Sequence, residues 1–208
     1  MHDEKSPQNN NSIKVSVAFA DPSAIGLFGL AIVTLVASSN KLGITDGVSL
    51  IIPWAIFLGA AAQIYASVAD GKLKNTFGAT AFGAYGFFWL GMAMTWMIQN
   101  GVFGETLQNS ADKHQLGFAF IGYLIFTLIM TYGAAGIHKI LFFIFVFIDI
   151  LFAGLAVNAL TGSEAAGLTA GVAELIISLL AFYGCGAAVL NAHFGKIILP
   201  TGKAFIKR

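Results

Sequence analysis

Six long apolar runs separated by short polar connections dominate this sequence. A bilayer core of about 30 Å is crossed by a helix of roughly 20 apolar residues, and each run is about that long. The runs are Pro22–Ser39, Val48–Val68, Phe77–Ile98, Leu116–Tyr132, Ile140–Leu160 and Leu168–Leu190. No connection between them is long enough to fold as a domain. We therefore expect an all-α integral membrane protein with six transmembrane helices, whose function resides within the bundle.

The composition narrows the function classes. Residues are 57% hydrophobic and only 10% charged, whereas a soluble domain usually carries about 25% charged residues. A net charge of +1 argues against a nucleic-acid partner. The single cysteine, Cys185, excludes a disulfide framework, and the four histidines match no metal-site spacing. With no nucleophile–base set in the sequence, we expect neither an enzyme nor a cofactor.

The basic residues predict the orientation of the bundle, since lysine and arginine favour the cytoplasmic side of a membrane. Of the 11 lysines and arginines, only Lys41 and Lys113 fall in connections on the opposite side. Both termini are therefore predicted to be cytoplasmic. Residues 1–20 and 196–208 form short polar tails that flank a bundle at 21–195.

Three stretches carry a resemblance to a known family. The first span opens with ADPSAIGLFGL (Ala20–Leu30), in which Asp21 suits a helix N-cap and Pro22 a first helical residue. The others are AAAQIYASVADGKLKNTFGATAFGAYGFFW (Ala60–Trp89) and NAHFGKIILPTG (Asn191–Gly202). The chain resembles the acetate uptake transporter family from Asp21 to Gly202. The first motif departs from the family pattern, since Asp21 replaces Asn, Ala24 replaces the second Pro and Leu30 replaces Phe.

The resemblance implies a homo-hexamer in which each protomer has its own pathway for small mono- or dicarboxylates. It also implies a constriction formed by Leu30, Tyr85 and Ile148. Each lies eight residues past the start of its predicted span, hence about 12 Å into the membrane. This common depth permits a ring, although three unrelated core or lipid-facing residues would show it too. Because Leu30 stands where the family has Phe, we expect a wider ring that admits succinate.

No predicted span contains a lysine or arginine, so an anion would depend on helix N-termini and neutral donors. We expect Gly26, Gln63, Asn75 and Thr76 to line a cytoplasmic vestibule, with Gln63 about one turn inside its span. The alternative is that Asn75 and Thr76 are only helix caps and Gln63 only satisfies backbone. Asp21, also placed at the substrate site, would compete with an anion unless it is protonated or turned away.

Asp149 and Glu174 are the only formal charges within the predicted spans. A charged carboxylate in mid-membrane costs about 2.5–3.5 kcal/mol, and with no cation nearby we expect both acids to be neutral or hydrated. Asp149 is either a proton carrier or the donor of an interhelical hydrogen bond, and Glu174 is interpreted as structural. His138 and His193 are either cytoplasmic pH sensors or ordinary loop histidines.

The sequence therefore predicts a multi-pass cell-membrane transporter or channel for acetate and related short-chain carboxylates such as succinate. Coupling to protons is left open. The alternative is a channel for a neutral solute, urea or ammonia, on a similar hexameric plan. A membrane sensor or scaffold is disfavoured because the chain has no output domain.

Overall fold

The computed structural model describes residues 20–206, and their helices confirm the six predicted spans. These spans are α1 (Ser23–Lys41), a composite of α2 (Ile51–Trp54), η1 (Ala55–Ala62) and α3 (Gln63–Lys72), then α4 (Thr76–Gln99), α6 (Lys113–Ala134), α7 (Lys139–Thr161) and α8 (Glu164–Phe194). Each is long and apolar enough to cross a membrane. A short helix, α5 (Glu105–Asn109), lies between α4 and α6, and no strand occurs in the described range. The predicted N-terminal tail, 1–20, lies outside the described residues except for Ala20.

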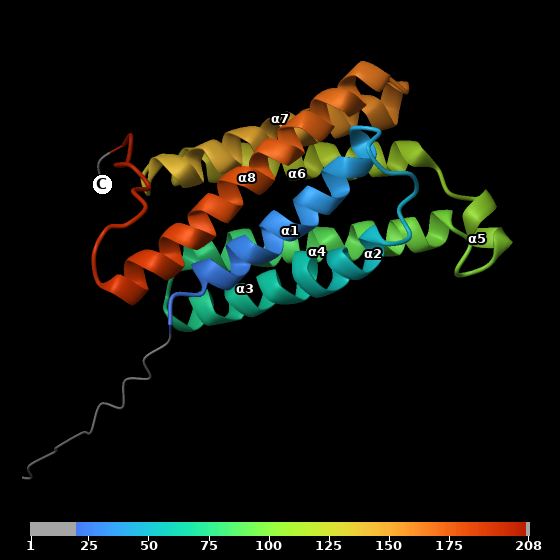
Figure 1. Cartoon of the computed structure of the whole chain (residues 1–208). Coiled ribbons are helices and arrows are strands. Elements are labelled where there is room, and N and C mark those ends of the chain that lie inside the picture. The colour runs from blue at the N-terminus through green and yellow to red at the C-terminus, as the bar shows by residue number, and fades with distance from the viewer. Residues whose placement is uncertain (1–19, 207–208) are drawn as a thin grey trace, which may run out of the picture.

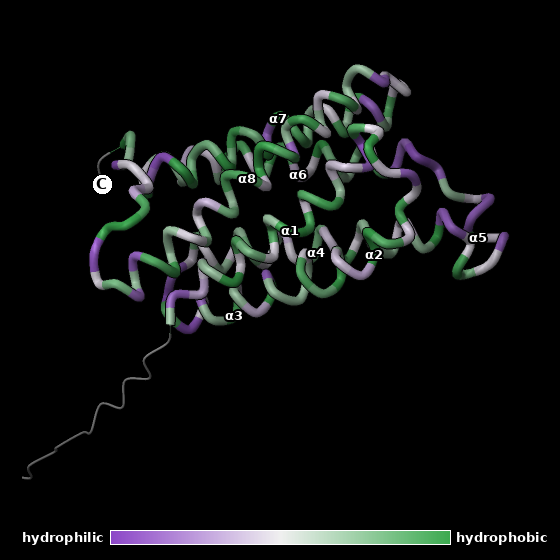
Figure 2. The backbone as a smooth tube through the Cα atoms, in the orientation of Figure 1, coloured by the Kyte–Doolittle hydropathy of each residue, from purple (hydrophilic) through white to green (hydrophobic). Residues whose placement is uncertain are grey.

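The spans run lengthwise through the bundle and alternate in direction, with α1 and α8 oblique to α4 and α6 (Figure 1). Helix α1 packs on α8, α7 packs on both α6 and α8, and the second span packs on α1 and α4. Helix α1 begins and α8 ends at the same end of the bundle, here called the terminal end, while α5 lies at the opposite end. Figure 2 shows polar residues gathered mainly in the connections at both ends. The bundle is thus built for a bilayer, and the cytoplasmic placement of the terminal end stays a prediction.

The second span extends further than its hydropathy predicts. The apolar run ends at Val68, but the helix continues to Lys72 and breaks only at Lys74, whose φ of 60° is left-handed. Hydropathy marks where apolar side chains stop, whereas a helix ends where its backbone can no longer hydrogen-bond. The extension places Asp70 inside α3, so the interpretation of Asp149 and Glu174 as the only charges within spans is wrong.

The middle of the second span is a π-helix, η1, an unusual conformation that often accompanies functional sites. Glycines let α1 and α4 approach it closely. A Cβ at Gly29 would overlap the carbonyl oxygen of Leu58, and a Cβ at Gly86 would lie 2.7 Å from Ile64 Cγ1 and 3.2 Å from the Ala60 carbonyl oxygen. Small residues at such crossings permit the tight packing typical of membrane helices. This packing holds Gln63, the residue after η1, between α1 and α4.

The described part of the C-terminal segment, 196–206, folds back on the bundle. The Thr201 carbonyl accepts the Ile140 N–H at 3.1 Å, and the Ala135 carbonyl accepts the Phe205 N–H at 2.8 Å. The Phe205 ring packs edge-on against Phe142, with the ring centroids 4.9 Å apart. The segment predicted as a polar tail therefore supplies a backbone acceptor to the first turn of α7.

Candidate functional site

A cavity of about 130 Å³ opens among α1, α3, α4 and α7 in the terminal half of the bundle. Most of its polar residues lie near the helix ends, and its other lining residues are largely apolar. The polar members are Ser23, Gln63, Asp70, Asn75 and His138. Leu30, Tyr85 and Ile148 lie seven to nine residues from the terminal ends of their helices, at about the depth of Gln63. No lysine or arginine is among the described residues that line it. The cavity thus leads from hydrogen-bonding groups toward an apolar and aromatic interior.

The structure brings the three predicted constriction residues to one cavity. Leu30, Tyr85 and Ile148 all line it, and they are only 7%, 5% and 3% exposed. They come from the middle of three different helices, α1, α4 and α7. The three residues thus share one cavity wall and are not unrelated positions. Their function as a constriction remains a prediction.

Hydrogen bonding fixes the direction of the Tyr85 hydroxyl. Its oxygen lies 2.9 Å from Thr127 Oγ1, and Thr127 Oγ1 also lies 2.7 Å from the Tyr123 carbonyl. Because a threonine hydroxyl has a single proton, which goes to the carbonyl, Tyr85 is the donor to Thr127. The Tyr85 ring stacks on Phe152 with centroids 6.4 Å apart. This side chain is therefore held in place on both its polar and its apolar side.

Gln63 is buried in the cavity wall, deeper than the sequence indicated. It lies nine residues before the end of α3 at Lys72, about two and a half turns rather than one. Its Nε2 donates to the Gly59 carbonyl at 2.8 Å. A carbonyl can only accept, so the amide oxygen must point elsewhere, and Oε1 has no partner among the described residues. The amide nitrogen of Gln63 is thus bound to the backbone, whereas its oxygen has no hydrogen-bond donor among the described residues.

Asn75 and Asp70 form a second polar pair in the wall. Asn75 is the N-cap of α4, as predicted, because its Oδ1 accepts the Gly78 N–H at 3.2 Å. Its Nδ2 donates to Asp70 Oδ1 at 2.9 Å. Asp70 is 2% exposed, and its Oδ2 has no partner within residues 20–206. The sequence prediction omitted Asp70, although its seven-residue spacing from Gln63 would place both on one face of a continuous helix.

Three of the predicted binding residues do not line the cavity. Gly26 is buried against Phe82, whose ring occupies the space of a Cβ at that position. Thr76 is exposed at the start of α4. Asp21 is exposed and its Oδ1 accepts the Ser23 N–H at 2.9 Å. The helix begins at Ser23 with Pro22 as its N-cap, so the predictions of Asp21 as N-cap and Pro22 as first helical residue are wrong. The Asp21 carboxylate thus accepts from the Ser23 N–H, a backbone donor that a bound anion would otherwise use.

His138 lines the cavity, although nothing in the sequence distinguished it from a loop histidine. It is the N-cap of α7, and its Nδ1 accepts the Leu141 N–H at 3.1 Å. Nδ1 must therefore carry no proton, which leaves Nε2–H as the donor of the neutral ring. Burial lowers the pKa of His138 below its ordinary value of 6.5. The site thus gains a neutral imidazole.

Asp149 lies outside the cavity and joins α7 to α6. Its Oδ2 is 2.7 Å from Thr131 Oγ1, which is also 2.9 Å from the Thr127 carbonyl. Thr131 Oγ1 is the donor in this contact, so the Asp149 carboxyl group accepts an interhelical hydrogen bond. The contact links two helices, as the structural interpretation expected, but with Asp149 as acceptor rather than donor. The proton-carrier role stays a prediction.

The expectation that no cation lies near Glu174 is wrong. Lys41 Nζ lies 2.9 Å from Glu174 Oε2, and the glutamate side chain is only 2% exposed. Lys41 is the last residue of α1, so its long side chain reaches inward from the opposite end of the bundle. A count of residues within apolar runs cannot anticipate this pairing.

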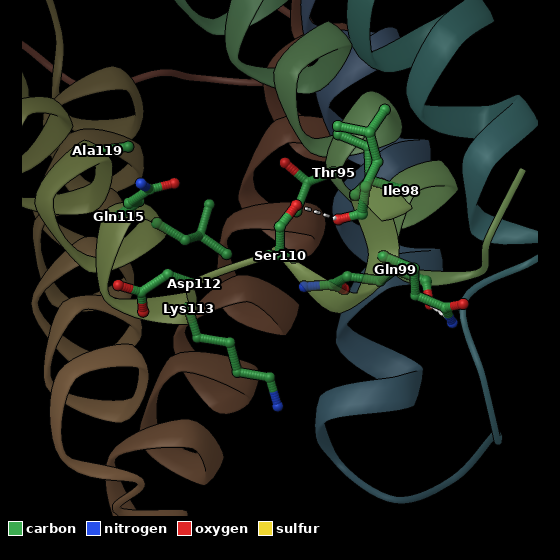
Figure 3. Close-up of a pocket in the computed structure, with 12 residues that line it drawn as sticks. Thr95, Ile98, Gln99, Ser110, Asp112, Lys113, Gln115 and Ala119 are labelled. Atoms are coloured by element: carbon green, nitrogen blue, oxygen red, sulfur yellow. Dashed lines mark hydrogen bonds between the residues drawn. The ribbon is translucent and has the colours of Figure 1, made fainter. Parts of the chain in front are cut away.

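A second hollow, of about 690 Å³, lies at the opposite end of the bundle (Figure 3). The end of α4, the α5 region and the start of α6 form it, with Gln99, Ser110 and Lys113 among its lining residues. It contains none of the predicted site residues. Among residues 20–206, no group of three or more His, Cys, Asp or Glu side chains is placed to hold a metal ion.

The chain has clear relatives among known proteins. Residues 5–203 match the GPR1/FUN34/yaaH family. The chain belongs to this family. The resemblance drawn from the three sequence stretches is thereby confirmed, and the GPR1/FUN34/yaaH fold accounts for the six-helix bundle.

The relatives of this chain include proteins named as transporters and a channel. The succinate-acetate/proton symporter SatP of Escherichia coli K12 is 34% identical over 186 residues, which cover 89% of this chain and 96% of that protein. Acetate permease A of Emericella nidulans is 27% identical over 195 residues, covering 88% of this chain and 65% of that protein. The solved structure of the bacterial acetate channel SatP matches with a TM-score of 0.83 at 33% identity, covering 89% of this chain and all of that one.

Proposed function

We propose that the protein moves acetate and related short-chain carboxylates, succinate included, across the cell membrane through a pathway inside each protomer. The observation that carries this proposal is the cavity, in which a polar wall leads to Leu30, Tyr85 and Ile148. The similarity to a symporter and to an acetate channel supports the same substrate class. These relatives point to a role in transport rather than in catalysis.

The polar wall provides the first binding position. Gln63 and Asn75 supply amide groups, and His138 supplies Nε2–H, so a small carboxyl group finds both donors and acceptors without a buried cation. Gly26 and Thr76 support this wall from behind, by seating Phe82 and by beginning α4. Asp21 stands at the terminal end as a fixed negative charge that lowers the local concentration of anions.

Leu30, Tyr85 and Ile148 act as the size filter in this proposal. An apolar ring disfavours a bare anion, because moving an unpaired charge into a low-dielectric region is costly. The ring favours small solutes that carry no net charge. Solutes are then selected for size and for charge at the same depth in the bundle.

The assembly we propose is a homo-hexamer embedded in lipid, with both termini cytoplasmic. Large apolar side chains cover the outer surfaces of α4 and α6, among them Phe87, Phe118 and Ile129, which are 62%, 70% and 68% exposed. Such a surface needs lipid or neighbouring protomers. Native mass spectrometry from detergent tests the stoichiometry, and a monomer in mild detergent and in nanodiscs contradicts it.

Uptake of radiolabelled acetate into proteoliposomes tests the function. We expect saturable uptake that unlabelled succinate suppresses, and empty liposomes serve as the control. Among the relatives is ammonia transport outward protein 2 of Saccharomyces cerevisiae, 28% identical over 185 residues. A matching ammonium pulse, followed by an internal pH dye, distinguishes that alternative. Ammonia flux without protein-dependent acetate uptake would refute the carboxylate proposal.

A further inference from the structure

The cavity wall contains a buried carboxyl group to which neither the sequence pattern nor the family comparison assigns a role. Asp70 is 2% exposed and lines the cavity. One oxygen, Oδ1, accepts from Asn75 Nδ2 at 2.9 Å, while Oδ2 has no hydrogen-bond partner among the described residues. A buried polar atom without a partner costs free energy, so its retention in a cavity wall points to a ligand that supplies a hydrogen.

Gln63 shows the same feature two turns away. Its Oε1 is also buried and unpartnered in the described structure, and it lies seven residues from Asp70 on the same helix. Seven residues correspond to about 10 Å along the axis and bring both side chains to one face. The wall therefore presents two free acceptors in sequence, with Asp70 near the terminal end and Gln63 close to the constriction. Acceptors of this kind complement the O–H of a carboxylic acid better than a carboxylate anion.

The surroundings of Asp70 allow it to gain and lose a proton. The groups that face it come from the starts of α1, α4 and α7. Near the start of α1, Asp21 adds a like charge. From the start of α7, His138 lines the same cavity, but its Nδ1 is committed to the Leu141 N–H, so it contributes no cation without losing that cap. At the start of α4, the neutral Asn75 amide touches the carboxylate.

We propose that Asp70 is the group that exchanges a proton with the substrate, so that the acid crosses the Leu30–Tyr85–Ile148 region in its neutral form. This inference rests on the proposed carboxylate transport. When the neutral acid leaves the apolar region, its O–H bond breaks, an O–H bond forms at Asp70 Oδ2, and the carboxylate anion departs to the terminal end. Asp70 then releases the proton to water at that end. In the reverse direction, a protonated Asp70 gives its proton to an arriving carboxylate.

Asp149 is a matched comparison, because its Oδ1 is likewise buried without a partner in the described chain. Its carboxyl group, however, contacts Thr131 at the α6–α7 contact and does not line the cavity. An exchange site must touch the substrate, which Asp70 can do and Asp149 cannot. The two acids therefore separate a role in proton exchange from a general effect of a buried carboxyl group.

The test compares wild type, Asp70→Asn, Asp70→Glu and Asp149→Asn in proteoliposomes loaded with a pH-sensitive dye. Acetate uptake and internal acidification are measured together under an inward proton gradient, with solute-independent proton leak subtracted. Asparagine keeps an oxygen that accepts from Asn75, so folding should survive, and thermal stability in detergent checks this. We expect Asp70→Asn to lose about tenfold or more of the gradient-driven uptake and its residual flux to carry no proton. Asp70→Glu should recover coupling, and Asp149→Asn should match wild type.

The outcomes separate the two proposals. If wild type moves acetate with protons and Asp70→Asn does so with an unchanged proton-to-acetate ratio, the role of Asp70 is wrong while carboxylate transport stands. If Asp149→Asn alone uncouples, proton exchange belongs to Asp149. If wild type moves no acetate, the proposed function itself fails, and the inference fails with it.

Discussion

Lys41 Nζ lies 2.9 Å from Glu174 Oε2 and thereby ties the last residue of α1 to the interior of α8. The glutamate side chain is 2% exposed and the lysine side chain 21%, so the pair is largely shielded from water. Removing one partner of such a pair leaves an uncompensated buried group.

We expect Lys41→Met to lower the free energy of unfolding by about 2–3 kcal/mol, toward the low end for buried pairs because the lysine is partly exposed. The double variant Lys41→Met/Glu174→Gln should recover most of the loss, since no charge then remains unpaired. Thermal unfolding in detergent is measured for wild type, Lys41→Met, Glu174→Gln and the double variant. Strict additivity of the two single changes would show that the pair does not couple.

Replacing Leu30 with phenylalanine should narrow the proposed constriction. Leu30 is 7% exposed and lines the cavity. The phenyl ring of phenylalanine is larger than the leucine side chain, so it would extend into the proposed pathway. We expect uptake of succinate to fall about tenfold more than uptake of acetate. Competition between the two labelled acids in proteoliposomes measures the ratio.

The matched control for this change is Leu35→Phe on the same helix. Leu35 is 39% exposed on the outer surface of α1, where an added ring meets no cavity wall. It should leave the ratio of succinate to acetate unchanged. If Leu30→Phe also leaves that ratio unchanged, Leu30 is not part of a size filter.

His138 should make stability depend on pH. Burial lowers its pKa below 6.5 in the folded protein, and its Nδ1 must be unprotonated to accept the Leu141 N–H. The unfolded chain therefore binds this proton more readily. The stabilising contribution is complete above about pH 6.5 and is lost as the pH falls below that value toward the folded-state pKa.

Melting temperatures of wild type and His138→Asn between pH 8 and pH 5 measure this effect. Asparagine caps helices well and does not titrate, so the variant should lose less stability on acidification. Titrating acids elsewhere affect both proteins equally and cancel in the difference. Parallel curves would exclude His138 as the source of the pH dependence.

Gly78 should tolerate no side chain, because Asp70 occupies the adjoining space. A Cβ there would overlap Asp70 Oδ2 and lie 2.6 Å from Asn75 Nδ2. Gly78→Ala should therefore cost about 1–3 kcal/mol of stability through overpacking. A Cβ at Gly71, one residue after Asp70, would meet no other group within 4 Å, and Gly71→Ala should be neutral or stabilising by about 0.5–1 kcal/mol. Thermal unfolding compares the two, and equal effects would contradict the placement of the Asp70 carboxylate.

Much of the fold could be predicted because the bilayer imposes a simple rule on sequence. A span must be long, apolar and helical, since lipid offers no hydrogen-bond partners to its backbone. The six spans and the shared depth of Leu30, Tyr85 and Ile148 follow from that rule and from the family resemblance. The end of the second span did not, because hydropathy declines at Val68 while the helix continues through Asp70.

The candidate site was only partly predictable. Gln63 and Asn75 line the cavity, whereas Gly26 and Thr76 do not. A residue near a helix start shares the general location of a site, but the direction of its side chain depends on which neighbouring helix it meets. His138 and Asp70 were missed for the converse reason, since each belongs to a polar stretch that becomes a cavity wall only after packing.

The sequence by itself determined the membrane environment, the number of spans and the absence of basic side chains within the apolar runs, because these depend on local length, hydrophobicity and charge. Only the tertiary structure decided which polar groups are satisfied. It paired Lys41 with Glu174, turned Asp149 toward Thr131 and left one oxygen of Asp70 free in the cavity wall. Such pairing depends on distances between helices far apart in the chain, which no local pattern of residues records.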